Sequence, residues 1–457
     1  MNRRELLSLV GAGFGSVGLS SLLAATSRSS SLAVRAPHFP ARAKHVIFLF
    51  LNGGLSQVDT FDPKPMLDRH DGDPLPGPKI KTDRASGNLM KSPFRFRQCG
   101  QSGLHVSEIF PRVGEAIDDF CVIRSMHSDN GNHEPSLLLM SCGHQLPGHP
   151  SMGSWVTYGL GSENENLPGF VVLCPGSPTV GPPLWSSGFL PNSFQGAHIR
   201  NNETETEKLV QNIRNATLGP DDQKRQLSLL DRLNRSYLGR LGQQPALESS
   251  IEAMEIAFRM QTEAPRVFDI TKEKESVRSR YGEHDFGRGC LMALRLVEHG
   301  VRMVQVFYGD FQPWDSPDDI MDHGRLARRA DGPIACLVED LKLRGLFDET
   351  LIIVGSEFGR TPMIQNSGLE KIGRGRDHNV HGYTTLLAGG GVKGGLAYGA
   401  TDDFGFKATE NPVHPNDLHA TVLHLLGLDH KRLTYRHSGR DFRLTDVGGK
   451  VLREILS

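Results

Sequence analysis

The chain has 457 residues, of which 38% are hydrophobic and 23% are charged. This composition is typical of a globular protein with a sizeable core, and it excludes disordered and fibrous classes. The 51 lysines and arginines almost balance the 52 acidic residues, so the formal net charge is −1. No excess of positive charge would attract nucleic acid, and we expect no nucleic-acid partner.

The first 43 residues are expected to be a signal peptide and a linker. Arg3 and Arg4 precede an apolar stretch that glycine and serine interrupt, and no acidic residue follows Glu5 within it. These features resemble a twin-arginine export signal, which carries folded proteins across the bacterial inner membrane. An uncleaved anchor is the alternative, since residues 6–25 are about as long as a membrane span. We expect an exported protein of the periplasm or cell envelope, with a membrane contact only through an uncleaved leader.

Four largely apolar runs in residues 44–457 predict strands that are buried on both faces, as in a parallel sheet. Patterns with helical periodicity separate them, among them residues 334–344 and 418–426. Strands that alternate with helices predict an α/β fold, with a mostly parallel central sheet and helices on both faces. We expect residues 44–457 to form a single domain. The four apolar runs are residues 45–51, 301–307, 350–355 and 384–388.

Residues 204–282 are charged and have a helical pattern. Pro220 with the two aspartates after it is a typical helix start, and residues 239–245 contain a break. This segment is predicted to be a helical insertion that forms a cap or a partner surface. The six cysteines lie far apart without a Cys-x-x-Cys pair, which argues against a disulfide scaffold and a structural zinc site.

Carboxylates and imidazoles follow the predicted strands, where α/β proteins gather their active-site groups. Such ligands suit zinc or manganese rather than calcium or magnesium. The alternatives are a Glu357–Arg360 pair that braces the sheet edge, and a solvated acidic loop after residue 314. The candidate metal ligands in chain order are Asp315, Asp319, His323, Glu357, Asp377 and His378.

The order of these motifs resembles the alkaline phosphatase superfamily, which includes sulfatases, nucleotide pyrophosphatases and cofactor-independent phosphoglycerate mutases. In that superfamily the first strand ends in a metal-binding Asp-Gly, and the corresponding dipeptide here is Asn52-Gly53. The superfamily's nucleophile opens a helix and is followed ten residues later by glycine, as His133 is followed by Gly143. The resemblance therefore places His133 at the position of the nucleophile.

Later motifs extend the resemblance over most of residues 44–457. The superfamily's Asp-x-x-x-His resembles Asp319 with His323, although Asp315 could supply the carboxylate instead. Its Asp-His-Gly resembles Glu357 with the Phe-Gly that follows it. Its last metal histidine lies eleven residues before a glycine-rich turn, and His378 has this spacing.

Four motifs resemble one exported family more closely, the domain of unknown function 1501 family of planctomycete-type bacteria, which is grouped with the alkaline phosphatases. A formylglycine sulfatase needs Cys or Ser at the position of His133 and Arg at that of Leu137, so this mechanism is excluded. The motifs are Asn-Gly-Gly with the later Asp-Thr-Phe-Asp-Pro at residues 52–63, Glu-Phe-Gly-Arg-Thr-Pro at 357–362, Gly-Arg-Asp-His at 375–378, and Ala-Gly-Gly-Gly-Val-Lys-Gly-Gly at 388–395.

The departures from the superfamily pattern predict one well-occupied divalent metal site at most. Asn52 replaces an aspartate and Phe358 replaces a histidine, which weakens the metal site beside the nucleophile. The other site, with an aspartate, His323 and His378, is more complete. It is expected to hold zinc or manganese.

His133 is predicted to be a metal ligand or a general acid/base, with a covalent nucleophile and a structural residue as the alternatives. Asn52 and Asn132 are candidates to donate to a developing oxyanion. Arg360 and Arg376 are expected to hold the anionic group of the substrate by bidentate hydrogen bonds. The alternative is that these arginines are structural partners of Glu357 and Asp377.

The resemblance leaves two functions open. The first is an exported hydrolase of phosphate or sulfate esters that uses metal-activated water, with an anionic small molecule or a polysaccharide ester as substrate. The second is a catalytically degenerate protein that keeps the fold as a binding or assembly module of the cell envelope. Trp185 and Trp314 are predicted either to line the pocket or to belong to the core.

Overall fold

The computed structural model describes residues 31–457, apart from 78–81, 83, 204, 210–216, 218, 242–244 and 366–373. The predicted leader and linker span residues 1–43, so residues 1–30 of them lie outside the described residues. Among the described residues, no helix combines the length and the apolar character that crossing a membrane requires. All six cysteines are free and buried.

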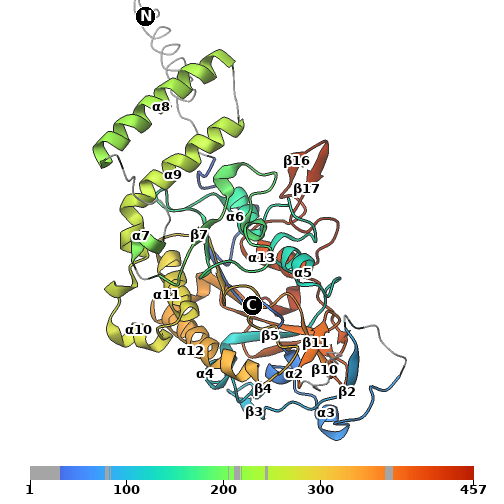
Figure 1. Ribbon diagram of the computed structural model, residues 1–457. Coiled ribbons are helices and arrows are strands. Elements are labelled where there is room, and N and C mark those ends of the chain that lie inside the picture. Colours follow the sequence, from blue (N-terminus) through green and yellow to red (C-terminus); the bar gives the residue numbers. More distant parts are fainter. Residues whose placement is uncertain are drawn as a thin grey trace, which may run out of the picture.

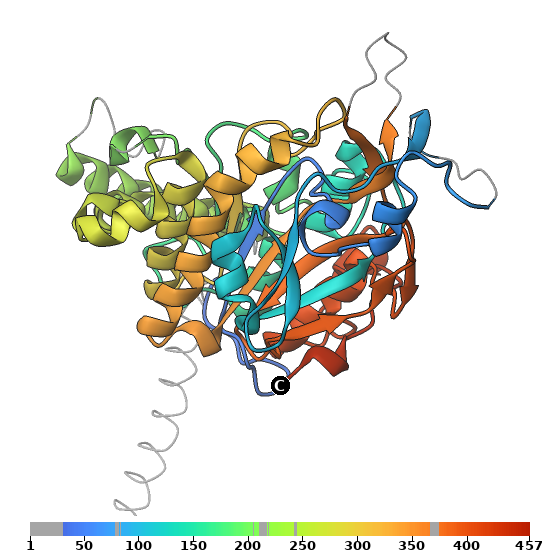
Figure 2. The same ribbon diagram turned by 90° about the horizontal axis from the view of Figure 1, so that it is seen from below.

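An eight-stranded sheet lies at the centre of the fold (Figures 1 and 2). Every pairing in it is parallel except those of β12, which runs antiparallel between β9 and β5. The predicted α/β class with a mostly parallel sheet is therefore confirmed. In spatial order the strands are β13 (Leu396–Tyr398), β5 (Phe120–Met126), β12 (Tyr383–Ala388), β9 (Thr350–Gly355), β1 (His45–Phe50), β8 (Met303–Phe307), β6 (Phe170–Leu173) and β7 (Ala197–Ile199).

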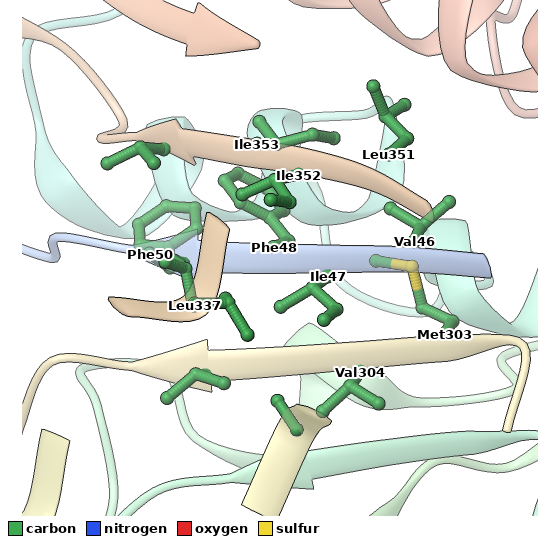
Figure 3. Packing of buried hydrophobic residues seen from close by; sticks show 14 of the residues in the cluster. Val46, Ile47, Phe48, Phe50, Met303, Val304, Leu337, Leu351, Ile352 and Ile353 are labelled. Carbon is green, nitrogen blue, oxygen red and sulfur yellow. The ribbon is translucent and has the colours of Figure 1, made fainter. Parts of the chain in front are cut away.

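The central strand β1 shows why these sequences form a parallel sheet. Each of its six side chains is buried, and Ile47 lies opposite Val304 on β8 and Ile352 on β9 (Figure 3). Burial of each such aliphatic side chain stabilises the fold by about 1.5–3 kcal/mol. Both faces of β1 pack against other parts of the core. Polar residues such as Lys44 and Asn52 therefore lie beyond the ends of the strand.

Helices cover both faces of the sheet, as the sequence predicts. Figure 1 shows α11 and α12 on one side, and α5, α6 and α13 on the other. α12 contains the predicted helix at residues 334–344 but begins earlier, and α13 matches the helix predicted at 418–426. The bounds of these helices are α5 (His133–Cys142), α6 (Met152–Leu160), α11 (Asp285–Glu298), α12 (Asp322–Leu343) and α13 (Pro415–Leu425).

The helical insertion projects from the sheet (Figures 1 and 2). α8 begins at Pro220, which confirms the predicted helix start. It continues to Leu241, into the predicted break, and α9 begins at Pro245, with residues 242–244 outside the described residues. The other helices are α2 (Gln57–Thr60), α3 (Pro65–Arg69), α4 (Pro111–Glu115), α7 (Thr206–Leu209), α8 (Pro220–Leu241), α9 (Pro245–Val267) and α10 (Glu275–Tyr281).

A three-stranded sheet lies beside the central one, and its strand β11 carries His378 to the site. In it β10 pairs antiparallel with both β11 and β2. The smaller strands are β2 (Ser86–Leu89), β3 (Phe96–Cys99), β4 (Leu104–Ser107), β10 (Gly359–Gln365), β11 (Arg376–Asn379), β14 (Ala400–Thr401), β15 (Ala408–Glu410), β16 (Tyr435–His437) and β17 (Arg440–Phe442).

Candidate metal site

The candidate site lies at the carboxyl ends of the adjacent strands β1, β8 and β9. Asn52 and Gly53 follow β1, Asp315 lies in the loop after β8, and Glu357 follows β9. Parallel strands end at the same edge of a sheet, so these loops meet there. The first residue of α5 and a residue of β11 complete the site from outside the central sheet.

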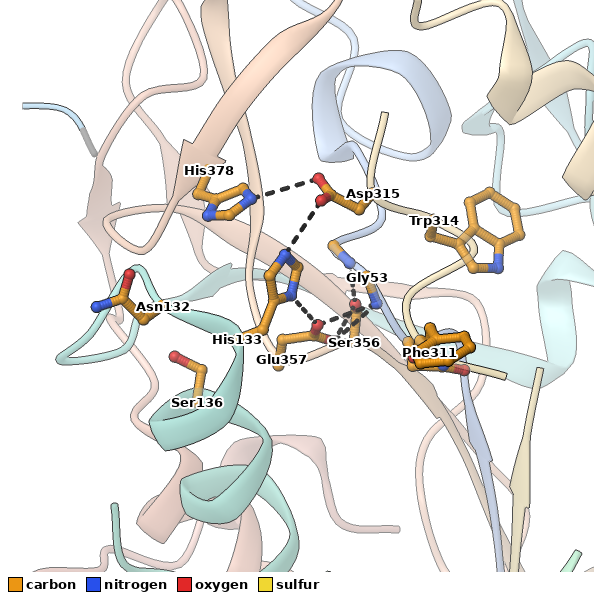
Figure 4. Close-up of polar contacts among 12 residues, drawn as sticks. Gly53, Asn132, His133, Ser136, Phe311, Trp314, Asp315, Ser356, Glu357 and His378 are labelled. Carbon is orange, nitrogen blue, oxygen red and sulfur yellow. Dashed lines mark hydrogen bonds and ion pairs between the residues drawn. The ribbon is translucent and has the colours of Figure 1, made fainter. Parts of the chain in front are cut away.

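His133, Asp315 and His378 form a group that could hold a metal ion. One ligand atom of each lies within 4.8 Å of the others, and the described residues contain no second group of this kind. Asp315 contacts both imidazoles from one side, with Oδ2 3.5 Å from His133 Nε2 and Oδ1 3.3 Å from His378 Nε2 (Figure 4). Three protein ligands leave positions on a divalent ion for water or substrate.

The second nitrogen of each imidazole is held by a hydrogen-bond acceptor. Nδ1 of His133 lies 2.7 Å from Glu357 Oε1, and Nδ1 of His378 lies 2.7 Å from the carbonyl oxygen of Gly131. Each Nδ1 therefore carries the proton, which leaves the lone pair of each Nε2 directed toward Asp315. The buried Nε2 of His133 has no hydrogen-bond partner among the described residues. This unsatisfied atom fits a metal ligand, and two imidazoles with one carboxylate suit zinc or manganese.

Glu357 supports His133 from behind. Its carboxylate is fully buried and accepts hydrogen bonds from the N–H of Gly53 at 3.0 and 3.1 Å and from the hydroxyl of Ser356 at 3.0 Å. With the bond from His133, these contacts satisfy both carboxylate oxygens. Glu357 was predicted to be a metal ligand. In the structure it lies outside the group of three and contacts His133 through Nδ1, the nitrogen that is not directed at Asp315.

Gly53 allows the loops after β1 and β8 to meet. Its φ is +123°, and a Cβ atom there would lie 2.4 Å from the backbone nitrogen of Asp315. Any side chain would collide with backbone, which cannot move aside as a flexible side chain could. The glycine of the Asn-Gly motif therefore sets the position of Asp315.

Electrostatic interactions within the group favour the charged form of Asp315. Burial alone would raise its pKa, but the contacts with His133 and His378 and the charge of Arg360 outweigh burial and hold the pKa far below its ordinary range. For His133, burial acts to lower the pKa, but Asp315 and Glu357 outweigh it and raise the pKa above its ordinary value. Asp315 is thus a carboxylate at neutral pH, as a metal ligand must be.

Both arginines that were predicted to hold substrate are fully buried. Arg360 donates to the carbonyl oxygens of Gly53 and Gly54 and lies 2.8 Å from Asp315 Oδ1. Arg376 forms a bidentate pair with Asp59, with distances of 2.7 and 3.1 Å. A clamp on substrate needs an exposed guanidinium group, so the structure favours structural roles.

The predicted structural partners of the arginines also differ from those observed. Asp377, expected beside Arg376, accepts backbone N–H groups of Arg84 at 2.7 Å and of His378 at 2.8 Å. It lies on β11 and is fully buried, so it orients the chain around His378 rather than joining the metal group.

Asp319 and His323, the superfamily-type pair, lie apart from the group. Asp319 is exposed, and its carboxylate accepts the backbone N–H of Met321 at 3.0 Å. His323 is fully buried on α12, where its Nε2 accepts the backbone N–H of Ser56 at 3.1 Å. This bond occupies the lone pair that a metal would need. Asp315, the alternative that the sequence left open, is therefore the aspartate that lies beside His133 and His378.

The two candidate oxyanion donors differ in accessibility. Nδ2 of Asn52 donates to the backbone carbonyls of Gly309, at 3.0 Å, and Phe311, so Asn52 is committed to holding the loop after β8. Asn132 is exposed at the N-cap of α5, next to His133 (Figure 4). Phe358, at the position of a superfamily histidine, packs its ring 4.8 Å from that of His133 and 4.5 Å from that of His378.

The buried imidazole of His323 predicts a pH dependence of stability. Burial, assisted by the charge of Arg360, lowers its pKa from the ordinary 6.5 to about 3. The unfolded chain takes up a proton near pH 6.5 and the folded chain does not, so stability falls as the pH drops through this window. Between pH 7 and pH 5 the metal-free protein should lose about 2 kcal/mol more unfolding free energy than the variant His323→Asn. Urea unfolding at both pH values measures this, and equal losses would contradict a neutral buried His323.

Comparisons with known proteins add a family and several similar folds. The model of the family described as "Protein of unknown function (DUF1501)" matches residues 43–456. No curated protein matches the sequence significantly.

Three solved structures illustrate the similar folds. The PsFucS1 sulfatase from Pseudoalteromonas sp. is 13% identical, with 85% of this chain and 68% of that chain covered and a TM-score of 0.34. The phosphonate monoester hydrolase of Agrobacterium radiobacter is 12% identical, with 84% and 74% covered and a TM-score of 0.35. A mutant of TAB5 alkaline phosphatase with bound Mg is 11% identical, with 85% and 99% covered and a TM-score of 0.35.

Proposed function

The chain belongs to the DUF1501 family, and we propose that it is a metal-dependent hydrolase of phosphate or sulfate esters. The observation that carries the proposal is the group of His133, Asp315 and His378, whose ligand atoms lie within 4.8 Å of one another. A bound divalent ion, zinc or manganese, would polarise the ester and lower the pKa of a water molecule. We propose a single metal ion.

The residues around the group have distinct tasks in this proposal. Glu357 fixes the tautomer of His133, and Arg360 holds the carboxylate of Asp315 in place at 2.8 Å. α5 begins at His133, and its first backbone N–H groups carry the positive end of the helix dipole. In this proposal these groups bind the anionic phosphate or sulfate group, and the exposed amide of Asn132 donates a further hydrogen bond to it. Substrate binding thus falls to α5 rather than to the buried arginines.

The proposal extends to location and substrate range. The leader predicted from the sequence supports export to the periplasm or cell envelope. The substrate is then an ester of an anionic small molecule or of a polysaccharide. A second function remains a candidate because both Arg360 and Arg376, which would clamp an anionic group, are fully buried. In that case the protein is a binding or assembly module of the envelope.

Metal content tests the proposal directly. We expect the purified protein to contain about one zinc or manganese ion per chain and the variant His378→Ala to contain almost none, because one of three ligands is lost. His381→Ala is the matched control, since His381 lies three residues away and packs on Phe406 outside the group. Elemental analysis measures the metal, and a panel of phosphate and sulfate monoesters measures hydrolysis. A metal-free native protein without esterase activity would overturn the proposal and favour the binding module.

A further inference from the structure

One aromatic ring beside the site is exposed in a strained conformation. Phe311 lies in the loop after β8, four residues before Asp315, and is 74% exposed. Its φ is +50°, a region that costs a residue other than glycine about 1–3 kcal/mol. Trp185 and Trp314, for which the sequence left a pocket role open, are buried in the core. Phe311 therefore combines an exposed aromatic ring with a positive φ.

The backbone of Phe311 is tied to the metal group. Its N–H donates to the carbonyl oxygen of Ser177 at 3.0 Å, and its carbonyl oxygen accepts from Asn52 Nδ2. Asn52 directly precedes Gly53, whose N–H binds Glu357, and Glu357 in turn binds His133. Figure 4 shows Phe311 in the same view as this chain of contacts. The backbone of Phe311 is therefore held in place relative to the group.

The surroundings of the ring favour a sugar. Phe311 and Asp310 border a hollow of about 520 Å³, whose other wall is the segment 177–182. Asp310 is exposed and has no hydrogen bond or ion pair with any described residue. An aromatic face stacks on the C–H face of a sugar ring, and a carboxylate accepts hydrogen bonds from sugar hydroxyls.

We propose that Phe311 and Asp310 form a sugar-binding subsite, so that the substrate is an ester carried on a carbohydrate. This inference rests on the proposed function for the reaction, but the binding of sugar does not. Phe311 stacks on the ring and Asp310 holds its hydroxyls, while the ester group lies toward His133, Asp315 and His378. The strained backbone keeps the ring exposed in the absence of ligand.

Binding of neutral oligosaccharides tests the subsite without the reaction. A panel of linear hexasaccharides without ester groups is titrated calorimetrically into the full chain. We expect at least one to bind, Phe311→Ala to weaken it about tenfold, and Phe311→Trp to retain it. The variant His378→Ala should bind the same sugar as well as the native protein, which separates this inference from the metal proposal. Absence of binding to every sugar, or equal binding by Phe311→Ala, would overturn the subsite.

A stability measurement gives an independent readout. Asparagine tolerates positive φ better than phenylalanine, so Phe311→Asn should relieve strain while removing an exposed ring. We expect the unfolding temperature of Phe311→Asn to rise although this variant loses sugar binding. This result is typical of a native residue that serves function at a cost in stability. A clear fall in unfolding temperature would show that Phe311 is a packing residue and would contradict the subsite.

Discussion

Replacement of Asp315 by asparagine is expected to weaken zinc or manganese binding by more than about 100-fold. Asp315 contacts both imidazoles, at 3.5 Å from His133 and 3.3 Å from His378, and it is the anionic member of the group. An asparagine of the same shape keeps the packing but removes the negative charge that neutralises the ion. The loss of metal affinity should therefore exceed that caused by replacing a residue that only supports a ligand, as Glu357 supports His133.

Asp319→Asn is the matched control, because the sequence alone offered both aspartates. Asp319 is exposed and its carboxylate accepts a backbone N–H in its own loop, so its replacement should leave metal affinity unchanged. Competition with a chromophoric chelator measures both variants, and urea unfolding verifies that each is folded. If Asp319→Asn loses the metal and Asp315→Asn keeps it, the metal lies elsewhere and the group of His133, Asp315 and His378 is not its site.

The fold was predictable where side chains are apolar on both faces. β1, β8, β9 and β12 match the four predicted runs, since burial on both faces leaves an almost continuous hydrophobic signal. β5 and β6 were missed for different reasons. β5 contains Arg124, which interrupts its apolar run and whose Nε donates to the carbonyl oxygen of Phe61 at 2.9 Å, and β6 has only four residues. The reversed direction of β12 leaves no trace in its own sequence.

The site was predictable as a set of loops but not as a set of contacts. Strand ends identified the loops of Asp315 and Glu357, because parallel strands gather their ends at one edge, whereas His378 comes from β11 outside the central sheet. Spacing could not choose between Asp315 and Asp319, since the choice depends on Gly53 allowing backbone contact with the loop after β8. Nor could it reveal that His323 accepts a hydrogen bond from Ser56.

The acidic partner of Arg376 could not be identified from the sequence either. Asp59 belongs to a motif that resembles the family, yet no role followed from that motif. In the structure Asp59 is the partner of Arg376 across more than 300 residues of chain, a contact that only the assembled fold creates. Phe311 was missed because exposure, not residue type, distinguishes it from the other aromatic residues.

Replacement of Arg376 by methionine is expected to destabilise the protein by about 3–5 kcal/mol, because it leaves the charge of Asp59 buried without a partner. Both side chains are fully buried, and the two bonds between them measure 2.7 and 3.1 Å. The double variant Asp59→Leu with Arg376→Met should recover much of the loss, since an apolar pair needs no compensating charge. Urea unfolding of the four proteins in this cycle measures the coupling. Additive effects would contradict a buried ion pair and favour a role of Arg376 in binding substrate.

The pH dependence of this cycle has a definite sign. Burial acts to raise the pKa of Asp59, but the charge and hydrogen bonds of Arg376 outweigh it and lower the pKa below its ordinary value of 3.8. The stabilisation is therefore present above pH 3.8 and is lost as the pH falls below it. In Arg376→Met only burial and hydroxyl contacts remain, so the carboxyl protonates more readily in the folded state. The stability difference between the native protein and Arg376→Met should thus be largest at neutral pH and should shrink under acid conditions, whereas the loss of a substrate contact would leave stability unchanged at every pH.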